Sequence, residues 1–225
     1  MDWRYNTIWF DHIDQNNIFH CDYKDNRVTK TDFDKVEYAK TFHFKHKGLA
    51  FDQLPQSDRL LYLEMNWANF KDLSGIEKFN NLKRLELHYC LKLANDKGIS
   101  SLKDSLEFLH INQSKKFIPT PELFELKNLK VLCLNVCAPL DNLKFLSNFP
   151  KLIDFRFVDT KILDGDLTPI IEHPTIRTVG FLNKRHYNLT DKELNAKLDL
   201  KSSVDYKEFV YRDEDKHRTY KYKYE

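Results

Sequence analysis

The sequence predicts an α/β protein built as a right-handed solenoid of short repeats, with a parallel sheet on its concave side and short helical or 3₁₀ segments on its convex side. Three observations lead to this fold class. Thirty leucines lie between Leu49 and Leu200, whereas residues 1–48 and 201–225 contain none. Within that block a leucine pattern recurs with a nearly constant period, which indicates a repeat architecture. No apolar run in the 225 residues approaches the ~18 residues that a membrane-spanning helix needs.

The recurring pattern is Leu-x-x-Leu-x-Leu, and six copies follow one another at intervals of 22 to 24 residues. The copies begin at Leu60, Leu82, Leu106, Leu129, Leu152 and Ile176. One such unit is too small to bury its own apolar side chains, but stacked units share a continuous core. Alternation along each strand sends the pattern positions inward and the residues between them outward. The six copies therefore predict six neighbouring parallel strands.

The six copies resemble leucine-rich repeats, and this resemblance implies that the position three residues beyond each pattern satisfies backbone groups in the turn that leaves the strand. That position holds Ala68, Cys90, Ser114, Cys137, Thr160 and Lys184. Thiol and hydroxyl side chains suit this role, whereas Ala68 and Lys184 do not. Cys90 and Cys137 are therefore predicted to be structural. The four cysteines include no CxxC pair, and without a visible export signal they are expected to be reduced.

Return segments between the strands carry apolar residues three or four positions apart, as in Leu73, Ile76 and Phe79. This spacing predicts a helical or 3₁₀ turn on the convex side. Thr120-Pro121 and Thr168-Pro169 are expected to open two of these turns, with threonine as the N-cap and proline at the first helical position.

The chain is expected to form a single domain, residues 1–225, in which residues 41–187 carry the repeats. Residues 1–40 are rich in aromatic and polar side chains and are expected to cover the first edge of the solenoid, because an open edge would expose unpaired strand groups. A degenerate first strand is predicted at 41–45, with Phe42 and Phe44 pointing inward.

Residues 188–225 are expected to cap the other end. The segment Thr190-Asp191-Lys192-Glu193 has the form of a capping box, which predicts a helix that runs to about Leu200. Residues 208–212 and 218–224 are predicted to pair as a hairpin across a polar turn. Its alternating tyrosines and lysines are typical of an exposed edge strand.

Over residues 60–187 the six patterns resemble those of leucine-rich repeat proteins. The stretch from Leu73 to Leu87 is similar to the internalin type of repeat. Residues 163–169 and 179–187 resemble the last repeats of bacterial leucine-rich repeat proteins found beside polymorphic toxin systems of the Rhs or contact-dependent kind. The resemblance implies a solenoid fold and, through its second part, an immunity protein that neutralises a cognate toxin by binding it. It implies no catalytic residues.

Outward positions on the sheet are the candidate binding residues, since the leucines between them are needed for the core. The first three repeats place aromatic and histidine side chains beside charged ones, a composition typical of protein-binding surfaces. A partner is predicted to bind Tyr62, Glu64, Trp67, Arg84, Glu86, His88, Tyr89, Phe108, His110, Asp154 and Arg156. The aromatic residues are expected to be exposed, with burial beneath the N-terminal segment or an insertion as the alternative. The carboxylates, together with Asp159, are expected to pair with basic groups of the partner.

An enzyme is not expected, because the chain contains no GxxxxGK[ST], GxGxxG, GxSxG or HExxH motif. Glu64 and Glu86 share a column on adjacent strands, about 5 Å apart by strand spacing. On an open sheet they favour a solvated charge cluster over a catalytic pair. His88 and Cys90 are predicted to point to opposite sides, so they lack the contact that a nucleophile and its base require.

A metal ion or other cofactor is not expected either. The pair His43 and His46 and the run His20-Cys21-Asp22 contain ligand-type side chains. However, neighbouring residues on a strand point to opposite faces, and no second pair with zinc-site spacing follows.

The charge balance also limits the partners that are expected. The 36 lysines and arginines against 34 aspartates and glutamates give a net charge of +2, so no global field attracts nucleic acid or an anionic membrane. The N-terminus lacks the basic start and apolar core of a secretory signal, which predicts a cytoplasmic protein. The expected partner is a protein, and the free chain is expected to be a monomer. The alternative function is a scaffold or regulatory subunit of a cytoplasmic enzyme; an adhesin or secreted effector would need an export signal.

Overall fold

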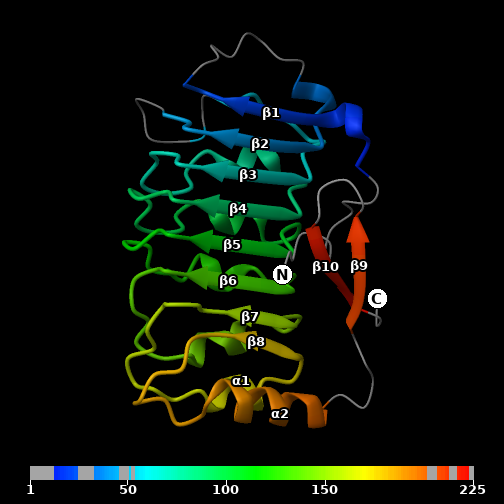
Figure 1. The fold of residues 1–225 in the computed structure, drawn as a ribbon. Coiled ribbons are helices and arrows are strands. Elements are labelled where there is room, and N and C mark those ends of the chain that lie inside the picture. The colour runs from blue at the N-terminus through cyan, green and yellow to red at the C-terminus, as the bar shows by residue number, and fades with distance from the viewer. Residues whose placement is uncertain are drawn as a thin grey trace.

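Eight parallel strands form one sheet in a computed structural model that describes residues 13–24, 33–45, 51 and 54–201, and the backbone of residues 207–212 and 217–222. The strands are β1 (Ile18–Asp22), β2 (Tyr38–Phe42), β3 (Tyr62–Asn66), β4 (Arg84–His88), β5 (Phe108–Asn112), β6 (Val131–Asn135), β7 (Asp154–Arg156) and β8 (Thr178–Gly180). Each strand lies beside the next one along the chain (Figure 1). The α/β class and the parallel sheet are therefore confirmed, in a layout consistent with a solenoid.

The six predicted strands pair in register. Leu63 lies opposite Leu85, which lies opposite Leu109, which lies opposite Leu132. The near-constant period explains this alignment, because a shift of one residue would turn every leucine away from the core. Identical positions of successive repeats therefore form continuous columns across the sheet.

The return segments form short 3₁₀ turns, as the apolar spacing predicts. They are η6 (Ile76–Phe79), η7 (Ile99–Leu102), η8 (Leu123–Glu125) and η9 (Lys144–Asn148), followed by the short helix α1 (Thr168–Glu172). Gly98 precedes η7 with a φ of 98°, and a Cβ atom there would lie 2.7 Å from the Leu73 carbonyl oxygen. Glycine is therefore required where this turn passes close to the preceding repeat.

The predicted threonine caps are wrong, because neither threonine occupies the N-cap position. For η8, the carboxylate of Asp96 in the preceding repeat accepts the N–H groups of Thr120 and Leu123, at 2.8 and 2.7 Å. For α1, Asp166 accepts the N–H of Thr168 at 3.0 Å. A carboxylate is the stronger acceptor for these unpaired N–H groups, and Asp96 reaches them only because the repeats stack.

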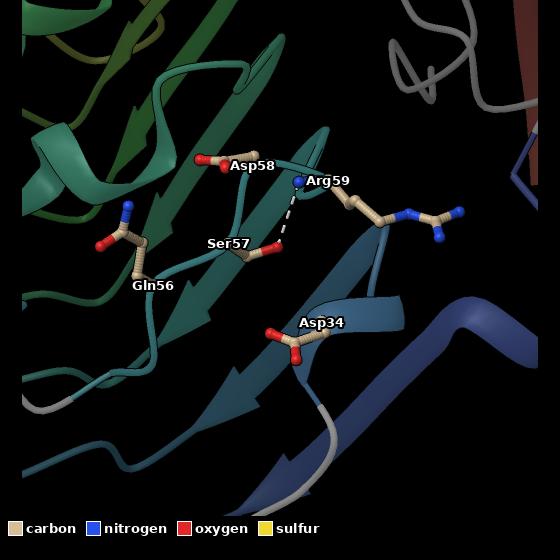
Figure 2. Close-up of a pocket in the computed structure, with 5 residues that line it drawn as sticks. All are labelled: Asp34, Gln56, Ser57, Asp58 and Arg59. Atoms are coloured by element: carbon tan, nitrogen blue, oxygen red, sulfur yellow. Dashed lines mark hydrogen bonds between the residues drawn. The ribbon is translucent and has the colours of Figure 1, made fainter.

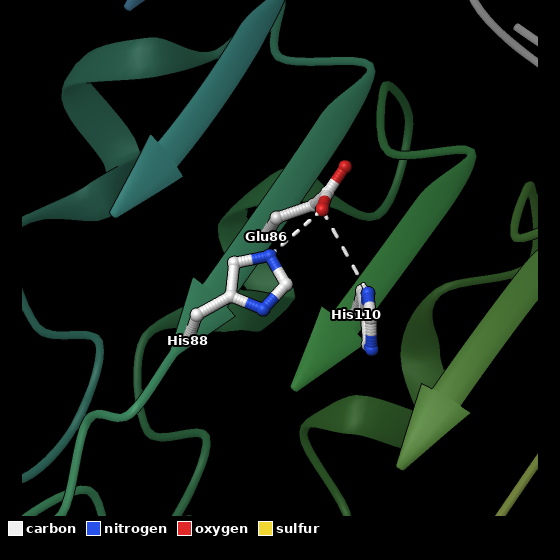
Figure 3. Close-up of side chains that lie close together, drawn as sticks. All are labelled: Glu86, His88 and His110. Atoms are coloured by element: carbon white, nitrogen blue, oxygen red, sulfur yellow. Dashed lines mark hydrogen bonds and ion pairs between the residues drawn. The ribbon is translucent and has the colours of Figure 1, made fainter. Parts of the chain in front are cut away.

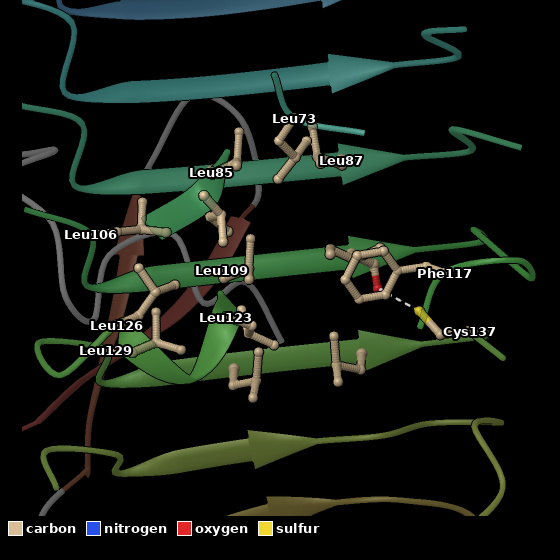
Figure 4. Packing of buried hydrophobic residues seen from close by; sticks show 14 of the residues in the cluster. Leu73, Leu85, Leu87, Leu106, Leu109, Phe117, Leu123, Leu126, Leu129 and Cys137 are labelled. Carbon is tan, nitrogen blue, oxygen red and sulfur yellow. Dashed lines mark hydrogen bonds between the residues drawn. The ribbon is translucent and has the colours of Figure 1, made fainter. Parts of the chain in front are cut away.

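The core is one continuous row of apolar side chains between the sheet and the return segments (Figure 4). Leu85, Leu109, Leu123 and Leu129 have no exposed surface. Each fully buried leucine contributes about 1.5–3 kcal/mol relative to an exposed one. The predicted inward positions of the repeats are thus confirmed as the core.

The turn position after each strand behaves as predicted in three of the repeats. The thiol of Cys90 lies 3.6 Å from the His88 carbonyl oxygen, and that of Cys137 lies 3.7 Å from the Ile111 carbonyl oxygen. The Thr160 hydroxyl donates to the Leu134 carbonyl oxygen at 2.7 Å. The Ser114 hydroxyl differs, since it is buried without a hydrogen-bond partner among the described residues. Burial raises the pKa of Cys90 to about 12, which supports a structural thiol.

The sheet begins earlier in the chain than predicted. The strand expected at 41–45 is β2, at Tyr38–Phe42, and its inward residues are Ala39 and Thr41, which lie opposite Leu63 and Met65. Phe42 points outward beside Asn66, so its predicted inward orientation is wrong. Because Ala39 and Thr41 do not match the leucine pattern, the sequence did not indicate the true position of this strand. β1 precedes β2 in the same sheet, within the segment expected to act only as a cap.

The C-terminal helix confirms the capping box. Helix α2 (Asp191–Lys201) follows Thr190, whose N–H donates to Glu193 Oε2 at 2.8 Å, while the Glu193 N–H donates to the Thr190 hydroxyl at 3.3 Å. Leu194 and Leu198 are buried, and the helix lies beyond β8 at the end of the stack (Figure 1).

The predicted hairpin is also present. β9 (Lys207–Arg212) and β10 (His217–Tyr222) pair antiparallel as a separate two-stranded sheet, and the predicted turn between them lies outside the described residues. Among the described residues no helix combines the length and apolarity of a membrane span.

Candidate functional site

The first outward column of the sheet is a stack of aromatic rings and one guanidinium group. The rings of Tyr38 and Tyr62 stack in parallel with centroids 4.0 Å apart. The Arg84 guanidinium carbon lies 4.6 Å from the Tyr62 ring centroid and 3.9 Å from the Phe108 ring centroid. All four side chains are buried. The prediction of exposed aromatic residues is therefore wrong for Tyr62 and Phe108. Tyr62 packs with Ile13 and Tyr38 of the N-terminal segment, as the alternative predicted, and strands about 4.8 Å apart let such side chains stack on one another.

The second outward column places two buried carboxylates beside this stack. Lys40 forms an ion pair with Glu64 at 3.0 Å, and the Arg84 Nε donates to Glu86 at 2.6 Å. The hydroxyl of Tyr62 lies 2.9 Å from a carboxylate oxygen of each glutamate and bridges them. Only 6% of Glu64 and 5% of Glu86 is exposed. The expected solvated charge cluster is instead a buried, internally paired network.

The charges in this network set the pKa values of both glutamates. Burial raises the pKa of Glu86, but the Arg84 guanidinium and the two neighbouring imidazoles outweigh burial, so it lies well below its usual value. Burial and the nearby Glu86 raise the pKa of Glu64, but the Lys40 ammonium and the Asn66 amide outweigh them and lower it overall. Both carboxylates are therefore ionised at neutral pH and neutralised from within the protein.

Two histidines complete the surroundings of Glu86 (Figure 3). His88 Nε2 lies 2.8 Å and His110 Nδ1 lies 3.7 Å from Glu86 Oε2. The second ring nitrogen of each histidine faces an amide: Asn112 Nδ2 is 3.4 Å from His88 Nδ1, and Asn135 Nδ2 is 3.0 Å from His110 Nε2. We call Arg84, Glu86, His88 and His110 the Glu86 network.

Glu86, His88 and His110 offer three metal-ligand atoms within 4.8 Å of one another, a grouping that the sequence reasoning missed although Glu86 and His110 share a column. Two imidazoles and a carboxylate suit zinc or iron(II). However, the oxygen of the Asn135 amide accepts the Val158 N–H at 2.9 Å, so its NH₂ group donates to His110 Nε2. The Nδ1 that faces Glu86 then carries the proton. A metal ion would have to displace that proton, which leaves hydrogen bonding as the favoured use of the cluster.

Asp154 and Arg156 form a further internal pair. Arg156 Nε lies 3.1 Å from the Asp154 carboxylate, whose residue has no exposed surface. Asp159 is exposed but lies 3.5 Å from Lys184 Nζ. The carboxylates predicted to pair with basic groups of a partner thus have basic partners within the chain.

The edge of the sheet where the strands end carries a different feature. The residue after the last outward strand position has a left-handed backbone in six successive repeats, with φ between 52° and 57°. These residues are His43, Trp67, Tyr89, Gln113, Val136 and Asp159. The N–H of Trp67 donates to the His88 carbonyl oxygen at 2.8 Å, and that of Tyr89 donates to the Asn112 carbonyl oxygen at 2.9 Å. Bonds between repeats therefore hold a conformation that side-chain-bearing residues rarely adopt.

Three of these left-handed residues form a stacked row of rings, which we call the aromatic ridge: His43, Trp67 and Tyr89. The His43 and Trp67 rings are 5.0 Å apart at 5°, and those of Trp67 and Tyr89 are 5.3 Å apart at 18°. Trp67 is 42% exposed and Tyr89 is 41% exposed. Of the predicted binding residues, these two are the aromatic side chains that remain on the surface.

A hollow of about 400 Å³ lies near the start of β3, lined by Asp34, Gln56, Ser57, Asp58 and Arg59 (Figure 2). The Ser57 hydroxyl accepts the Arg59 N–H at 3.2 Å, so this polar group of the lining already has a hydrogen-bond partner within its own loop. None of the predicted site residues lines this hollow. It offers neither an apolar floor nor converging catalytic groups.

The structure thus divides the predicted binding residues into two groups. Nine lie on the outward face of the sheet in paired or stacked arrangements, with His88, His110 and Arg156 partly exposed there, and two lie in the aromatic ridge. Comparison with known proteins adds no family to this description, since neither a family model nor a curated protein matches the chain.

Proposed function

We propose that this chain is a protein-binding module and that its partner contacts the aromatic ridge. One observation carries the proposal: Trp67 and Tyr89 are large aromatic side chains, about two-fifths exposed, on left-handed backbone positions. Tryptophan and tyrosine are the residues most enriched at the energetic centres of protein interfaces. Because each ring stacks on its neighbour, little conformational freedom is left to lose on binding.

The Glu86 network has a supporting role in this proposal. Its carboxylate is surrounded by Arg84, two imidazoles and the Tyr62 hydroxyl, which leaves no free base for catalysis among these groups. Burial raises the pKa of the nearby Cys133 well above its usual value, so its thiol is a poor nucleophile. The network links β4, which Tyr89 directly follows, to β5 through His110 and to β3 through the Tyr62 hydroxyl.

The partner that we propose is a toxin, neutralised by steric occlusion. This part rests on the likeness of residues 163–169 and 179–187 to immunity proteins. A small chain with an exposed, rigid binding edge and no assembled catalytic centre among its described side chains fits that role.

The test is co-expression with each gene that adjoins the gene for this chain and is toxic when expressed alone. Wild type should restore growth and form a complex on size-exclusion chromatography, whereas Trp67→Ala with Tyr89→Ala should lose both. Leu200→Ala is the matched control, since Leu200 is an exposed apolar residue on α2. A lethal toxin in the presence of folded wild type, with no complex on mixing, would refute the toxin proposal. A stable complex with a cytoplasmic enzyme instead would favour the scaffold alternative.

A further inference from the structure

The turns that adjoin the aromatic ridge carry five exposed lysines. They are Lys45, Lys71, Lys92, Lys115 and Lys116, and they occupy the turns that leave β2, β3, β4 and β5. None of them forms an ion pair with another described residue. In contrast, Lys40 within β2 and Lys83 and Lys130, which directly precede β4 and β6, are all paired with glutamates. We call these five residues the lysine strip.

Hydrogen bonds between the turns bring the lysine strip together along one edge. The Asn69 N–H donates to the Phe44 carbonyl oxygen at 3.2 Å, the Ala94 N–H to the Lys71 carbonyl oxygen at 2.8 Å, and the Ile118 N–H to the Ala94 carbonyl oxygen at 3.0 Å. Equivalent parts of successive turns therefore lie side by side. The lysines form one strip next to the ridge although the sequence spreads them over some 70 residues.

Two acidic groups, Asp72 and Asp96, lie further along the same connections, just before η6 and η7, and do not pair with the strip. Asp72 is half-buried and its carboxylate accepts the Ser74 N–H at 3.0 Å. Asp96 is fully buried and caps η8. The chain as a whole carries a net charge of only +2, so the excess of basic groups on these turns is a local feature. The edge also carries Asp22, which pairs with His43 at 2.9 Å before the strip, and Asp159 beyond it.

Apolar side chains are interspersed with the lysines. Leu91 is 61% exposed and Ile118 is 55% exposed, on the turns after β4 and β5. Together with Trp67 and Tyr89 they add exposed apolar side chains to the same edge as the lysines. This arrangement complements a segment that presents apolar residues among carboxylates.

We infer that the partner meets the aromatic ridge and the lysine strip through an acidic, partly apolar protein segment, an inference that rests on the proposed function. It reverses the charge pattern expected from the sequence, in which carboxylates of this chain meet basic groups of the partner. Glu64, Glu86 and Asp154 already have internal basic partners, whereas the lysines of the strip have none among the described residues.

A single-stranded nucleic acid is the other anion that aromatic and basic groups can bind. The spacing of the ridge disfavours insertion of bases between its rings. A base inserted between two rings would need them roughly 7 Å apart, twice the 3.4 Å stacking distance, and the ridge rings are 5.0 and 5.3 Å apart. The ring faces inside the ridge are covered by one another, while the edges that remain exposed suit apolar side chains.

The first experiment measures binding of the full chain, at low and moderate salt, to the toxin identified by the co-expression test above. A triple variant, Lys92→Glu with Lys115→Glu and Lys116→Glu, should weaken binding by at least ~10-fold, and the loss should shrink as salt rises. The matched control, Lys97→Glu with Lys103→Glu and Lys144→Glu, makes the same charge change at three exposed lysines in or next to η7 and η9 and should change binding less than about twofold.

The two proposals fail differently in this experiment. If Trp67→Ala abolishes toxin binding but the strip variant binds as wild type does, the ridge function stands and the acidic partner is refuted. If Trp67→Ala and the strip variant both bind normally, the ridge function itself is refuted.

A second experiment uses defined probes in place of the toxin. A synthetic peptide of alternating glutamate and leucine or phenylalanine should crosslink through its carboxylates to Lys92, Lys115 and Lys116 with a zero-length carbodiimide reagent. The same peptide with lysine for glutamate, and a single-stranded oligouridine, should bind more weakly. Equal crosslinking at Lys97 and Lys103, or tighter binding of the oligouridine, would overturn the inference.

Discussion

On β4, the guanidinium of Arg84 and the carboxylate of Glu86 form an ion pair in which both side chains are more than nine-tenths buried. Removing one member of such a pair leaves an unpaired charge in a poorly solvated place, which costs about 3–5 kcal/mol. We expect Arg84→Met to lower the free energy of unfolding by that amount in urea denaturation. The double variant with Glu86→Gln should recover part of the loss, and strictly additive losses would contradict the coupling.

Acid should destabilise the protein in two stages. Burial lowers the pKa of His110 and His173 in the folded protein. As the pH falls, these histidines therefore take up protons at a higher pH in the unfolded chain than in the folded one. Their contribution to stability is present above the unfolded pKa of about 6.5 and is lost as the pH falls below it. The lowered pKa of Glu86 adds a second loss below about pH 4.5.

Thermal unfolding between pH 8 and pH 4 measures this dependence. His173 Nε2 lies 3.1 Å from the Leu146 carbonyl oxygen, and glutamine retains a donor for that contact. His173→Gln should therefore flatten the decline between about pH 6.5 and 5. A stability that rises on acidification through this range would contradict the assignment of neutral buried histidines.

Val136 is the β-branched member of the left-handed column, with a φ of 52°. Asparagine tolerates this conformation far better than valine. Val136→Asn is expected to raise the free energy of unfolding by about 0.5–1 kcal/mol, as judged by urea denaturation. Val158→Asn is the control, since Val158 has a negative φ and should gain nothing.

Metal affinity at the Glu86 network should be controlled by Asn135. In the wild type its NH₂ group keeps the proton of His110 on the nitrogen that faces Glu86, so zinc binding should be weak in isothermal titration. Asn135→Asp provides an acceptor instead, frees that nitrogen for a metal ion, and should tighten zinc binding by at least ~10-fold. His110→Ala in the same background should abolish the gain, and tight binding by the wild type would refute the proton assignment.

Truncation of the aromatic ridge separates binding from folding. Trp67→Ala or Tyr89→Ala should weaken partner binding by about 2 kcal/mol or more. Because both side chains are about two-fifths exposed, the melting temperature should change little. A large loss of thermal stability with unchanged affinity would instead assign these rings a structural role.

The capping box at Thr190 and the six leucine patterns are features that the local sequence predicted correctly. Both features act through residues close together in the chain: Thr190 and Glu193 bond each other across one helical turn, and the pattern positions alternate along a single strand. The period then aligns the repeats. These parts of the fold can be predicted without knowing which residues of other repeats pack against them.

The predicted exposure of the outward columns failed because it depends on neighbours in other repeats. Alternation shows that Tyr62 and Arg84 leave the leucine core, but their burial comes from stacking across β2 to β5. Likewise, Asp96 replaces Thr120 as a cap only through contact with the next repeat.

The sequence by itself determined the repeat, the leucine core and the parallel sheet, because a period and an alternating pattern depend only on spacing along the chain. The tertiary structure alone decided which polar and aromatic residues remain available. Stacking of the repeats paired the carboxylates on the outward face of the sheet with internal cations, and it brought Trp67 and Tyr89 to the same edge as the lysines of separate turns. Free surface is what remains after side chains distant in sequence have satisfied one another, so it cannot be deduced from one repeat at a time.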